Sequence, residues 1–525
     1  MRLLNIFMSS THKHLRNLAI NWGGHASALL VMFFLSPYIV GKLDAVSYGI
    51  WSLLTVLTGY MGIFDLGVRA SVGRHVALYL GKDDPVGVDE TIRAGFGVFT
   101  LTGGLILIAG ILLGWFFPAL FKGVSQEHYD TVRYLLPFMT VNIWLAAIST
   151  IYSSVLTAHD RFDIARGVDL FVLFVRTAST VYVLHVGWGL WGLAGSLILG
   201  NFIALIVNRI SAGIVYSGLR SFPLIFSKKR MNELFVYGFF SFISSVSVKI
   251  IGQSDLIIVG AFLSVASVRE YSIGATLIYY TTPFITMIHR TFFPSVQRSI
   301  SSGGFSQARD LLFKQLKISF CFGLLAYIGL SFYAEPFIKL WMYQEGFDLQ
   351  SVAEAGTVMS ILALSKIPSL YILPCQSVLA AMGHVRFNAF RTVSEAIVNI
   401  LFSLVFVMWL KWGLAGVAAG TLVARILVAS ISVPYFLCKK AEIPIRKFIV
   451  SVVLPAVLAA TLFSFYCYSI NKFLLPVTWY EFIGHVFAAI FLWCLISLTI
   501  LLPKDSRQKI LINIKTFKMF SHRKT

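Results

Sequence analysis

The chain is short of charged residues. Only 13% of its 525 residues are Asp, Glu, Lys or Arg, whereas 57% are hydrophobic and the mean hydropathy is +0.80. A water-soluble globular domain carries about 25% charged residues, so this composition excludes that class. The sequence therefore predicts a polytopic membrane protein.

Cysteine is also scarce, and the chain lacks the short motifs that hold metals or phosphates in loops. The five cysteines are odd in number, and none has metal-ligand spacing. A disulfide framework and a zinc site are both unexpected, and buried free thiols are the simpler interpretation. No glycine-rich phosphate loop of the P-loop kind occurs. We therefore expect no cofactor and no metal.

Long apolar runs dominate what is present. Each run approaches or exceeds the roughly 20 residues that span a bilayer as a helix, and none alternates like a barrel strand. The fold class predicted is all-α, with about 14 transmembrane helices. The runs lie near residues 18–40, 47–68, 94–117, 134–157, 167–187, 189–210, 233–262, 271–297, 315–333, 352–379, 390–410, 413–437, 448–469 and 481–502.

Lys and Arg are unevenly divided between alternate loops. With the N-terminus in the cytoplasm, 32 of the 43 basic residues fall in cytoplasmic segments and seven in the opposite loops. Basic loops resist translocation, so both termini are predicted to be cytoplasmic. The net charge of +20 is then mainly a topology signal, and attraction to anionic lipids adds to it without any nucleic-acid partner.

A pentapeptide, Trp-Gly-Leu-Ala-Gly, occurs at 191–195 and again at 412–416. It indicates an internal duplication of two six-helix halves, and membrane proteins built from such halves are often transporters. Because each half has six helices, the repeats are predicted to be parallel. The domains expected are an N-terminal lobe at 1–212, a cytoplasmic linker at 213–232, a C-terminal lobe at 233–438, a further helix pair at 439–502 and a basic cytoplasmic tail at 503–525.

Several short stretches of the chain carry a family resemblance. They are Val46-Ser47-Tyr48-Gly49, Asp65-Leu66-Gly67-Val68-Arg69, Glu335-Pro336-Phe337-Ile338-Lys339-Leu340-Trp341, Leu379-Ala380-Ala381-Met382-Gly383-His384, Asn399 and Gly413-Leu414-Ala415-Gly416. These stretches resemble the polysaccharide exporters of the MOP superfamily, the Wzx-type flippases. The resemblance covers roughly residues 15–440, and the helix pair beyond it is similar to that of fourteen-helix lipid II flippases.

The resemblance implies a non-enzymatic flippase of the bacterial inner membrane. Its substrate would be an undecaprenyl-diphosphate-linked oligosaccharide, moved by alternating access for O-antigen or exopolysaccharide assembly. Expected partners are this glycolipid, membrane lipids and other polysaccharide assembly proteins. Two alternatives share the fold, namely a multidrug antiporter of the MATE type and a lipid II flippase. A membrane glycosyltransferase is disfavoured because the outer loops are short and no acid–base constellation occurs.

Four basic residues cannot be assigned to loops: Arg176, Lys249, Lys366 and Arg425. Counted at 1.5 Å per residue from the apparent helix starts, they lie about 15, 24, 21 and 18 Å along their helices. A lone cation at the bilayer centre costs about 2.5–3.5 kcal/mol, so these side chains must face the interior or a partner. We expect them to line a shared route for an anionic substrate, as a phosphate suits Arg and Lys.

Structural roles compete with this interpretation. Lys249 could pair with Asp255, and Arg425 could bond to backbone carbonyls. Asp255 could instead take part in ion coupling, because intramembrane acids often do so, although pairing is the commoner role. Glu395 lies within a few residues of a cytoplasmic end and is set aside, and Arg391 is assigned to a cytoplasmic loop.

Overall fold

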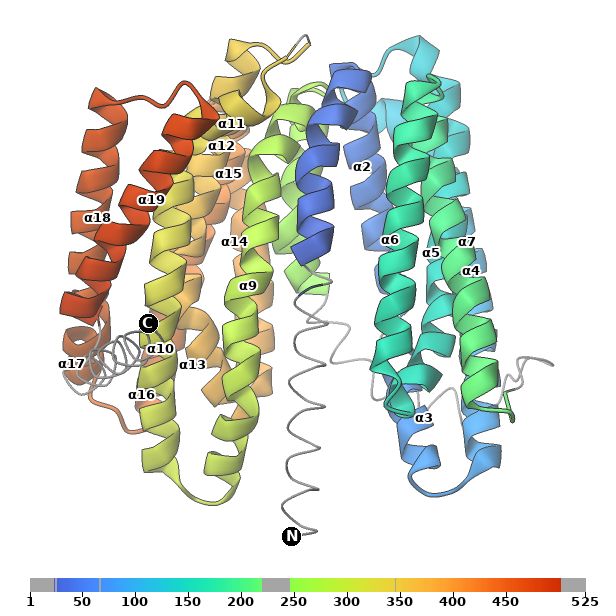
Figure 1. Cartoon of the computed structure of the whole chain (residues 1–525), viewed down its shortest axis with the longest axis horizontal. Helices are drawn as coiled ribbons and strands as arrows, with labels where there is room; N and C mark the ends of the chain where they lie inside the picture. Colours follow the sequence, from blue (N-terminus) through green and yellow to red (C-terminus); the bar gives the residue numbers. More distant parts are fainter. Residues whose placement is uncertain (1–22, 24–25, 66–67, 220–245, 345, 502–525) are drawn as a thin grey trace, which may run out of the picture. The chain divides into compact units, whose positions relative to one another are not determined.

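The computed structural model describes residue 23 and residues 26–65, 68–219, 246–344 and 346–501. Helices make up nearly all of these residues, and no β-strand occurs among them. The prediction of an all-α membrane fold is confirmed (Figure 1).

The helix bounds follow the predicted apolar runs. Two helices are named here by their residues alone. Helix Ala26–Lys42 comes before α2 in the chain, and helix Val246–Leu263 comes between α7 and α9. The labelled helices are α2 (Ala45–Met61), α3 (Val68–Leu80), α4 (Pro85–Leu120), α5 (Tyr129–Ala158), α6 (Phe162–His185), α7 (Gly189–Val215), α9 (Ser267–Ser301), α10 (Phe305–Phe332), α11 (Ala334–Met342), α12 (Leu349–Lys366), α13 (Ser369–Ala381), α14 (Val385–Met408), α15 (Gly413–Ala424), α16 (Ser430–Lys440), α17 (Ile445–Phe448), α18 (Leu454–Phe473) and α19 (Trp479–Ile496).

Eleven helical stretches within the described residues are long and apolar enough to cross a membrane. Two shorter apolar helices, Ala26–Lys42 and Ala45–Met61, and the 35-residue α9 occupy the three remaining predicted positions. The chain is therefore a multi-span membrane protein. The count of fourteen crossings stays a prediction.

Side-chain and proline signals set several helix starts. The carboxylate of Asp44 accepts the Ser47 N–H at 2.9 Å and caps α2, as short acidic side chains do at helix N-termini. Pro85 occupies the first turn of α4, where its missing N–H costs nothing. Thr478 and Glu481 form a reciprocal capping box that begins α19.

The chain divides into two compact units, one comprising Met1–Arg269 with Gln344–Gly346, the other Glu270–Tyr343 with Phe347–Thr525. Much of the predicted linker at 213–232 lies outside the described residues. The predicted domain boundaries therefore stay a prediction, and each unit is considered by itself below.

In the first unit, α5 packs against both α4 and α7, and α6 packs against α7. Helix α2 approaches the chain after helix Val246–Leu263 very closely at Gly49, where an added Cβ would lie 1.8 Å from the carbonyl oxygen of Val265. Only glycine fits such a contact between backbones.

In the second unit, α10 packs against α12, α13 and α18, and α15 packs against α14 and α12. The helices α18 and α19 follow the predicted duplication in the chain and lie against α10 (Figure 1). Buried apolar residues of α18 and α19, including Phe463 and Trp493, belong to the same hydrophobic core as those of α10. The added helix pair is thus built into the second unit.

The helix starts correct the register of the duplication. Trp188 caps α7 and Trp412 caps α15, and each is followed by a glycine with positive φ, Gly189 at 51° and Gly413 at 58°. The structural equivalent of Trp412 is therefore Trp188, one helical turn before the Trp191 that the pentapeptide aligns with it. Trp-Gly-Leu occurs twice in a row at 188–193, so sequence identity alone selected the wrong copy.

Candidate functional site

Two arginines share one buried carboxylate in the second unit. Nε of Arg425 lies 2.5 Å from Oε1 of Glu395, and Nη1 of Arg391 bonds to Oε2 of the same side chain. Arg391 and Glu395 are four residues apart on α14, so they face the same side of that helix. The Glu395 side chain is 2% exposed, and burying a carboxylate so deeply is costly unless cations lie against it.

The backbone is irregular on both sides of this ion-pair cluster, which we call the Arg-Glu-Arg triad (Arg391, Glu395 and Arg425). The apolar stretch Leu349–Ala381 is broken between α12 and α13 at Ile367 and Pro368, because proline has no N–H to continue the ladder. Arg425 begins a π-helical segment, Arg425–Ala429, inside the stretch Gly413–Lys440. Interrupted helices and π segments are common where membrane transporters bind ligands.

Polar groups from the broken helix complete the cluster. Nη1 of Arg425 donates to Oγ of Ser369, the first residue of α13, at 2.5 Å. Arg391 donates to Oγ1 of Thr392 at 2.7 Å, and the Gln376 amide on α13 can accept from Arg391 at 2.5 Å when its oxygen faces the guanidinium. The triad thus ties α14 and the start of the π segment to α13.

Lys366 is the last residue of α12, three positions before Ser369, and is partly buried. A cation is favourable there because the final carbonyls of a helix carry partial negative charge. This position gives Lys366 a structural reason to be basic in addition to the predicted role in substrate binding.

Arg176 lies just past the middle of α6 and is exposed. The stem of its side chain passes Gly200 of α7, where an added Cβ would be 3.6 Å from the Arg176 Cβ. Its guanidinium makes no ion pair or hydrogen bond with the described residues. Arg176 is therefore a cation within a membrane span. No described residue of the first unit compensates its charge.

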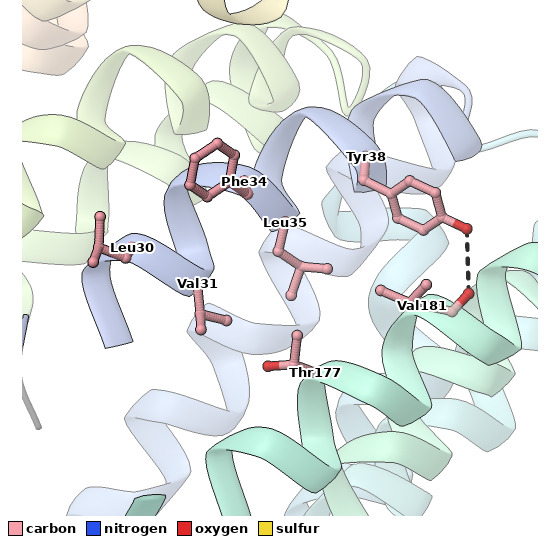
Figure 2. A pocket seen from close by; sticks show the side chains of 7 residues that line it. All are labelled: Leu30, Val31, Phe34, Leu35, Tyr38, Thr177 and Val181. Atoms are coloured by element: carbon pink, nitrogen blue, oxygen red, sulfur yellow. Dashed lines mark hydrogen bonds between the residues drawn. The ribbon is translucent and has the colours of Figure 1, made fainter. Parts of the chain in front are cut away.

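An apolar groove of about 460 Å³ runs between helix Ala26–Lys42 and α6. One of its lining residues, Thr177, directly follows Arg176 in the sequence. Figure 2 shows its two walls and the Tyr38 hydroxyl at one end, which donates to the Val181 carbonyl at 3.2 Å. The Thr177 hydroxyl donates to the Leu173 carbonyl at 2.8 Å. Both hydroxyls are thus used internally, so the groove suits an apolar occupant. It is lined by Leu30, Val31, Phe34, Leu35, Tyr38, Thr177 and Val181.

Lys249 has a structural partner in the first unit. Its ammonium donates to the carbonyl of Gly59, and the Tyr60 hydroxyl donates to the Lys249 carbonyl at 3.2 Å. Asp255, on the same helix, is 4% exposed. The helical depth of Lys249 was counted from Glu233, which lies outside the described residues. The substrate role of Lys249 and the ion-coupling role of Asp255 stay predictions.

The structure places the predicted residues in two sets, with Arg176 and Lys249 in the first unit and Lys366 and Arg425 in the second. It also adds Arg391 and Glu395, which sequence reasoning assigned to a loop and a helix end. Their i,i+4 spacing was the available signal. In the described residues no group of three or more His, Cys, Asp or Glu side chains could hold a metal ion.

The chain is similar in sequence to proteins named for polysaccharide biosynthesis and transport. A family model described as "Polysaccharide biosynthesis protein" matches residues 97–345. A putative O-antigen transporter of Shigella flexneri is 22% identical over 424 residues, which cover 79% of this chain and 96% of that protein. A probable low-salt glycan biosynthesis flippase of Haloferax volcanii is 24% identical over 196 residues, covering 37% of this chain and 40% of that protein.

Two solved structures share the fold. The lipid II flippase MurJ in an inward closed conformation has a TM-score of 0.64 at 16% identity, covering 93% of this chain and 98% of that one. An inward-facing multidrug resistance MATE family transporter of the MOP superfamily has a TM-score of 0.63 at 14% identity, covering 78% of this chain and 98% of that one.

The helix content defines a multi-span membrane protein, and its fold is the one found in these two solved transporters. The resemblance to polysaccharide exporters that the sequence predicted is confirmed by the family match and the O-antigen transporter relative.

Proposed function

We propose that this protein is a flippase that moves an undecaprenyl-diphosphate-linked oligosaccharide across the bacterial inner membrane, with both termini in the cytoplasm, for O-antigen or exopolysaccharide assembly. The family match and the relatives named as a putative O-antigen transporter and a probable glycan biosynthesis flippase support a polysaccharide flippase. Alternating access would carry the substrate from one leaflet to the other, and no bond is made or broken in that step. Membrane lipids and other polysaccharide assembly proteins are its proposed partners.

The observation that carries the proposal is the uncompensated Arg176 within the span of α6. Insertion of a central arginine costs about 2.5–3.5 kcal/mol, a cost that a protein retains where the charge serves a pathway. A diphosphate offers several anionic oxygens, and the planar guanidinium binds such oxygens in pairs. An organic-cation substrate would be repelled by the same group. This charge favours the glycolipid over a drug-antiporter function.

The apolar groove supports the lipid part of the substrate. Its two hydroxyls are satisfied internally, so it offers hydrocarbon walls and no competing hydrogen bond. Arg176 directly precedes Thr177, which lines the groove. We place the polyprenyl chain in this groove with its diphosphate near Arg176, since a cation beside an apolar wall matches an anionic head on a hydrocarbon tail.

The membrane potential favours transport of the diphosphate from the cytoplasmic side outward. Moving two negative charges outward through about 100 mV, inside negative, releases about 4.6 kcal/mol. Return of the emptied, cationic protein is then the unfavourable half of the cycle. We propose that a counter-ion assists this return, with Asp255 as the candidate residue.

The test is complementation of a deletion strain with Arg176→Ala and Arg176→Lys. We score surface polysaccharide and the amount of protein in the membrane together. Arg176→Ala should lose most of the glycan at normal protein level, and Arg176→Lys should retain part of it because a point charge remains. Lys82→Ala, at an exposed cation in a turn, is the matched control. Unchanged glycan in Arg176→Ala would overturn the proposal.

A further inference from the structure

The Arg-Glu-Arg triad carries more positive than negative charge. Each carboxylate oxygen of Glu395 contacts one arginine, and neither Arg391 nor Arg425 has a second acidic partner among the described residues. Two guanidinium groups therefore share one carboxylate, which leaves a net charge of +1 in a nearly buried site. An uncompensated charge in such surroundings is strongly unfavourable unless an anion approaches it.

The three side chains differ in depth. The Glu395 side chain is 2% exposed, while those of Arg391 and Arg425 are 10% and 14% exposed. The carboxylate thus lies behind the guanidinium groups. Arg425 uses Nε for Glu395 and Nη1 for Ser369, and its Nη2 has no hydrogen bond within the described residues. Within the described residues, Nη2 of Arg425 is therefore the donor left for an incoming anion, whereas the Arg391 guanidinium already contacts Glu395, Thr392 and Gln376.

A buried ion pair of this kind adds little net stability, because desolvation of the charges offsets their attraction. The position of the triad in the fold is more informative than its contribution to stability. The triad meets both irregularities of the helical backbone, the break before Ser369 and the π segment that begins at Arg425. In transporters, interrupted helices are where charged ligands are held at membrane depth.

From these contacts we infer that Arg391 and Arg425 form a phosphate-binding site in the second unit, and that Glu395 is a built-in anion that holds both arginines in place and competes with the ligand. The two carboxylate oxygens take one guanidinium each, as two oxygens of a diphosphate would. An entering diphosphate shares or replaces these contacts. In naming a lipid diphosphate as the ligand, this inference rests on the proposed function. Glu395 is a positioning residue, and Arg391 and Arg425 are the binding residues.

The test uses inorganic pyrophosphate and the purified full-length protein, with the thermal unfolding midpoint as readout and chloride at equal ionic strength as the reference. Glu395→Gln removes the competing charge and leaves two arginines without their anion. Pyrophosphate should raise the midpoint of Glu395→Gln more than that of the unaltered protein. The half-saturating concentration should fall about tenfold, the change expected from roughly 1.4 kcal/mol.

Two further variants keep the inference falsifiable. The double variant Glu395→Gln with Arg425→Gln lacks half of the site and should lose the added response. Glu395→Asp, whose shorter side chain cannot reach both arginines as Glu395 does, should respond in between and serves where Glu395→Gln does not fold. An identical pyrophosphate response in the unaltered protein, Glu395→Asp and Glu395→Gln overturns the inference.

The outcome is separable from that of the proposed function. A pyrophosphate response in Glu395→Gln together with unchanged surface glycan in Arg176→Ala would keep the anion site and remove the glycolipid flippase. Loss of glycan in Arg176→Ala without any pyrophosphate response in the Glu395 variants would do the reverse.

Discussion

The indole Nε1 of Trp493 on α19 donates a hydrogen bond of 2.6 Å to the carbonyl oxygen of Cys321 on α10. Trp493 is 2% exposed, and its ring packs against Phe463 of α18 with centroids 4.9 Å apart. The Trp493 side chain thus packs and hydrogen-bonds the C-terminal helix pair against α10 of the second unit.

We predict that Trp493→Ala destabilises the protein by about 3–5 kcal/mol, because it empties a large buried site. Trp493→Phe keeps most of the ring volume and loses the hydrogen bond, a loss of about 0.5–1.5 kcal/mol. Thermal unfolding in detergent and protein level in membranes measure both. Trp409, which is 80% exposed, supplies the control Trp409→Ala. Equal effects of Trp493→Ala and Trp409→Ala would contradict this role of Trp493.

Gly49→Ala should prevent correct packing of the first unit. Its Cβ would lie 1.8 Å from the Val265 carbonyl oxygen, and backbone on both sides leaves no flexible side chain to move. Gly104→Ala is the matched control, because nothing lies within 4 Å of a Cβ there. Within a helix, that change should be neutral or stabilise by about 0.5–1 kcal/mol. Membrane abundance distinguishes the two, and a normal level of Gly49→Ala would show that α2 can shift.

A buried amide links α7 to α5. Nδ2 of Asn208 donates to Oγ of Ser149 at 3.0 Å, and the two residues are 5% and 6% exposed. Ser149→Ala leaves the amide unsatisfied and should cost about 1–3 kcal/mol. Adding Asn208→Leu should recover part of that loss, because the pair is then wholly apolar. Unfolding midpoints of the two single variants and the double variant form the cycle, and a double variant that is less stable than both singles would refute this explanation.

Filling the apolar groove should block transport without unfolding the protein. Val31→Trp places an indole among the groove walls, where we propose that the polyprenyl chain lies. Surface glycan should fall several-fold at unchanged membrane abundance. Leu105→Trp, at a position on α4 that is 58% exposed, adds the same ring outside the groove and should have no effect. Equal glycan in both variants would place the hydrocarbon chain elsewhere.

Much of the fold could be predicted because its signals are local. Apolar runs of span length, basic loops and the repeated Trp-Gly-Leu depend on near neighbours in the chain, and they predicted the all-α class and the added pair α18–α19. The register of the repeat was wrong because Trp188 and Trp191 are alike in sequence. Only the positive φ of Gly189 shows which tryptophan caps the helix.

The candidate site was less accessible to sequence reasoning. Arg176 and Arg425 were identified because a cation within an apolar run is conspicuous. Arg391 and Glu395 were set aside because they lie close to a helix start, where charged residues are common. Their role depends on Arg425, which lies thirty positions after Glu395 in the chain. The packing of α14 against α15 and the π segment brings Arg425 to the same carboxylate as Arg391.

By itself the sequence determined that this protein spans the membrane many times and which residues enter the spans as cations, and it predicted a duplication of two halves. Hydropathy and charge act on each segment separately, so they need no knowledge of the partner helices. Tertiary structure alone decided which cations are compensated. Lys249 is hydrogen-bonded to the Gly59 carbonyl and Arg425 is paired with Glu395, whereas Arg176 has no such partner within the described residues. Charge compensation is a property of distances between segments, and those distances arise only when the helices pack.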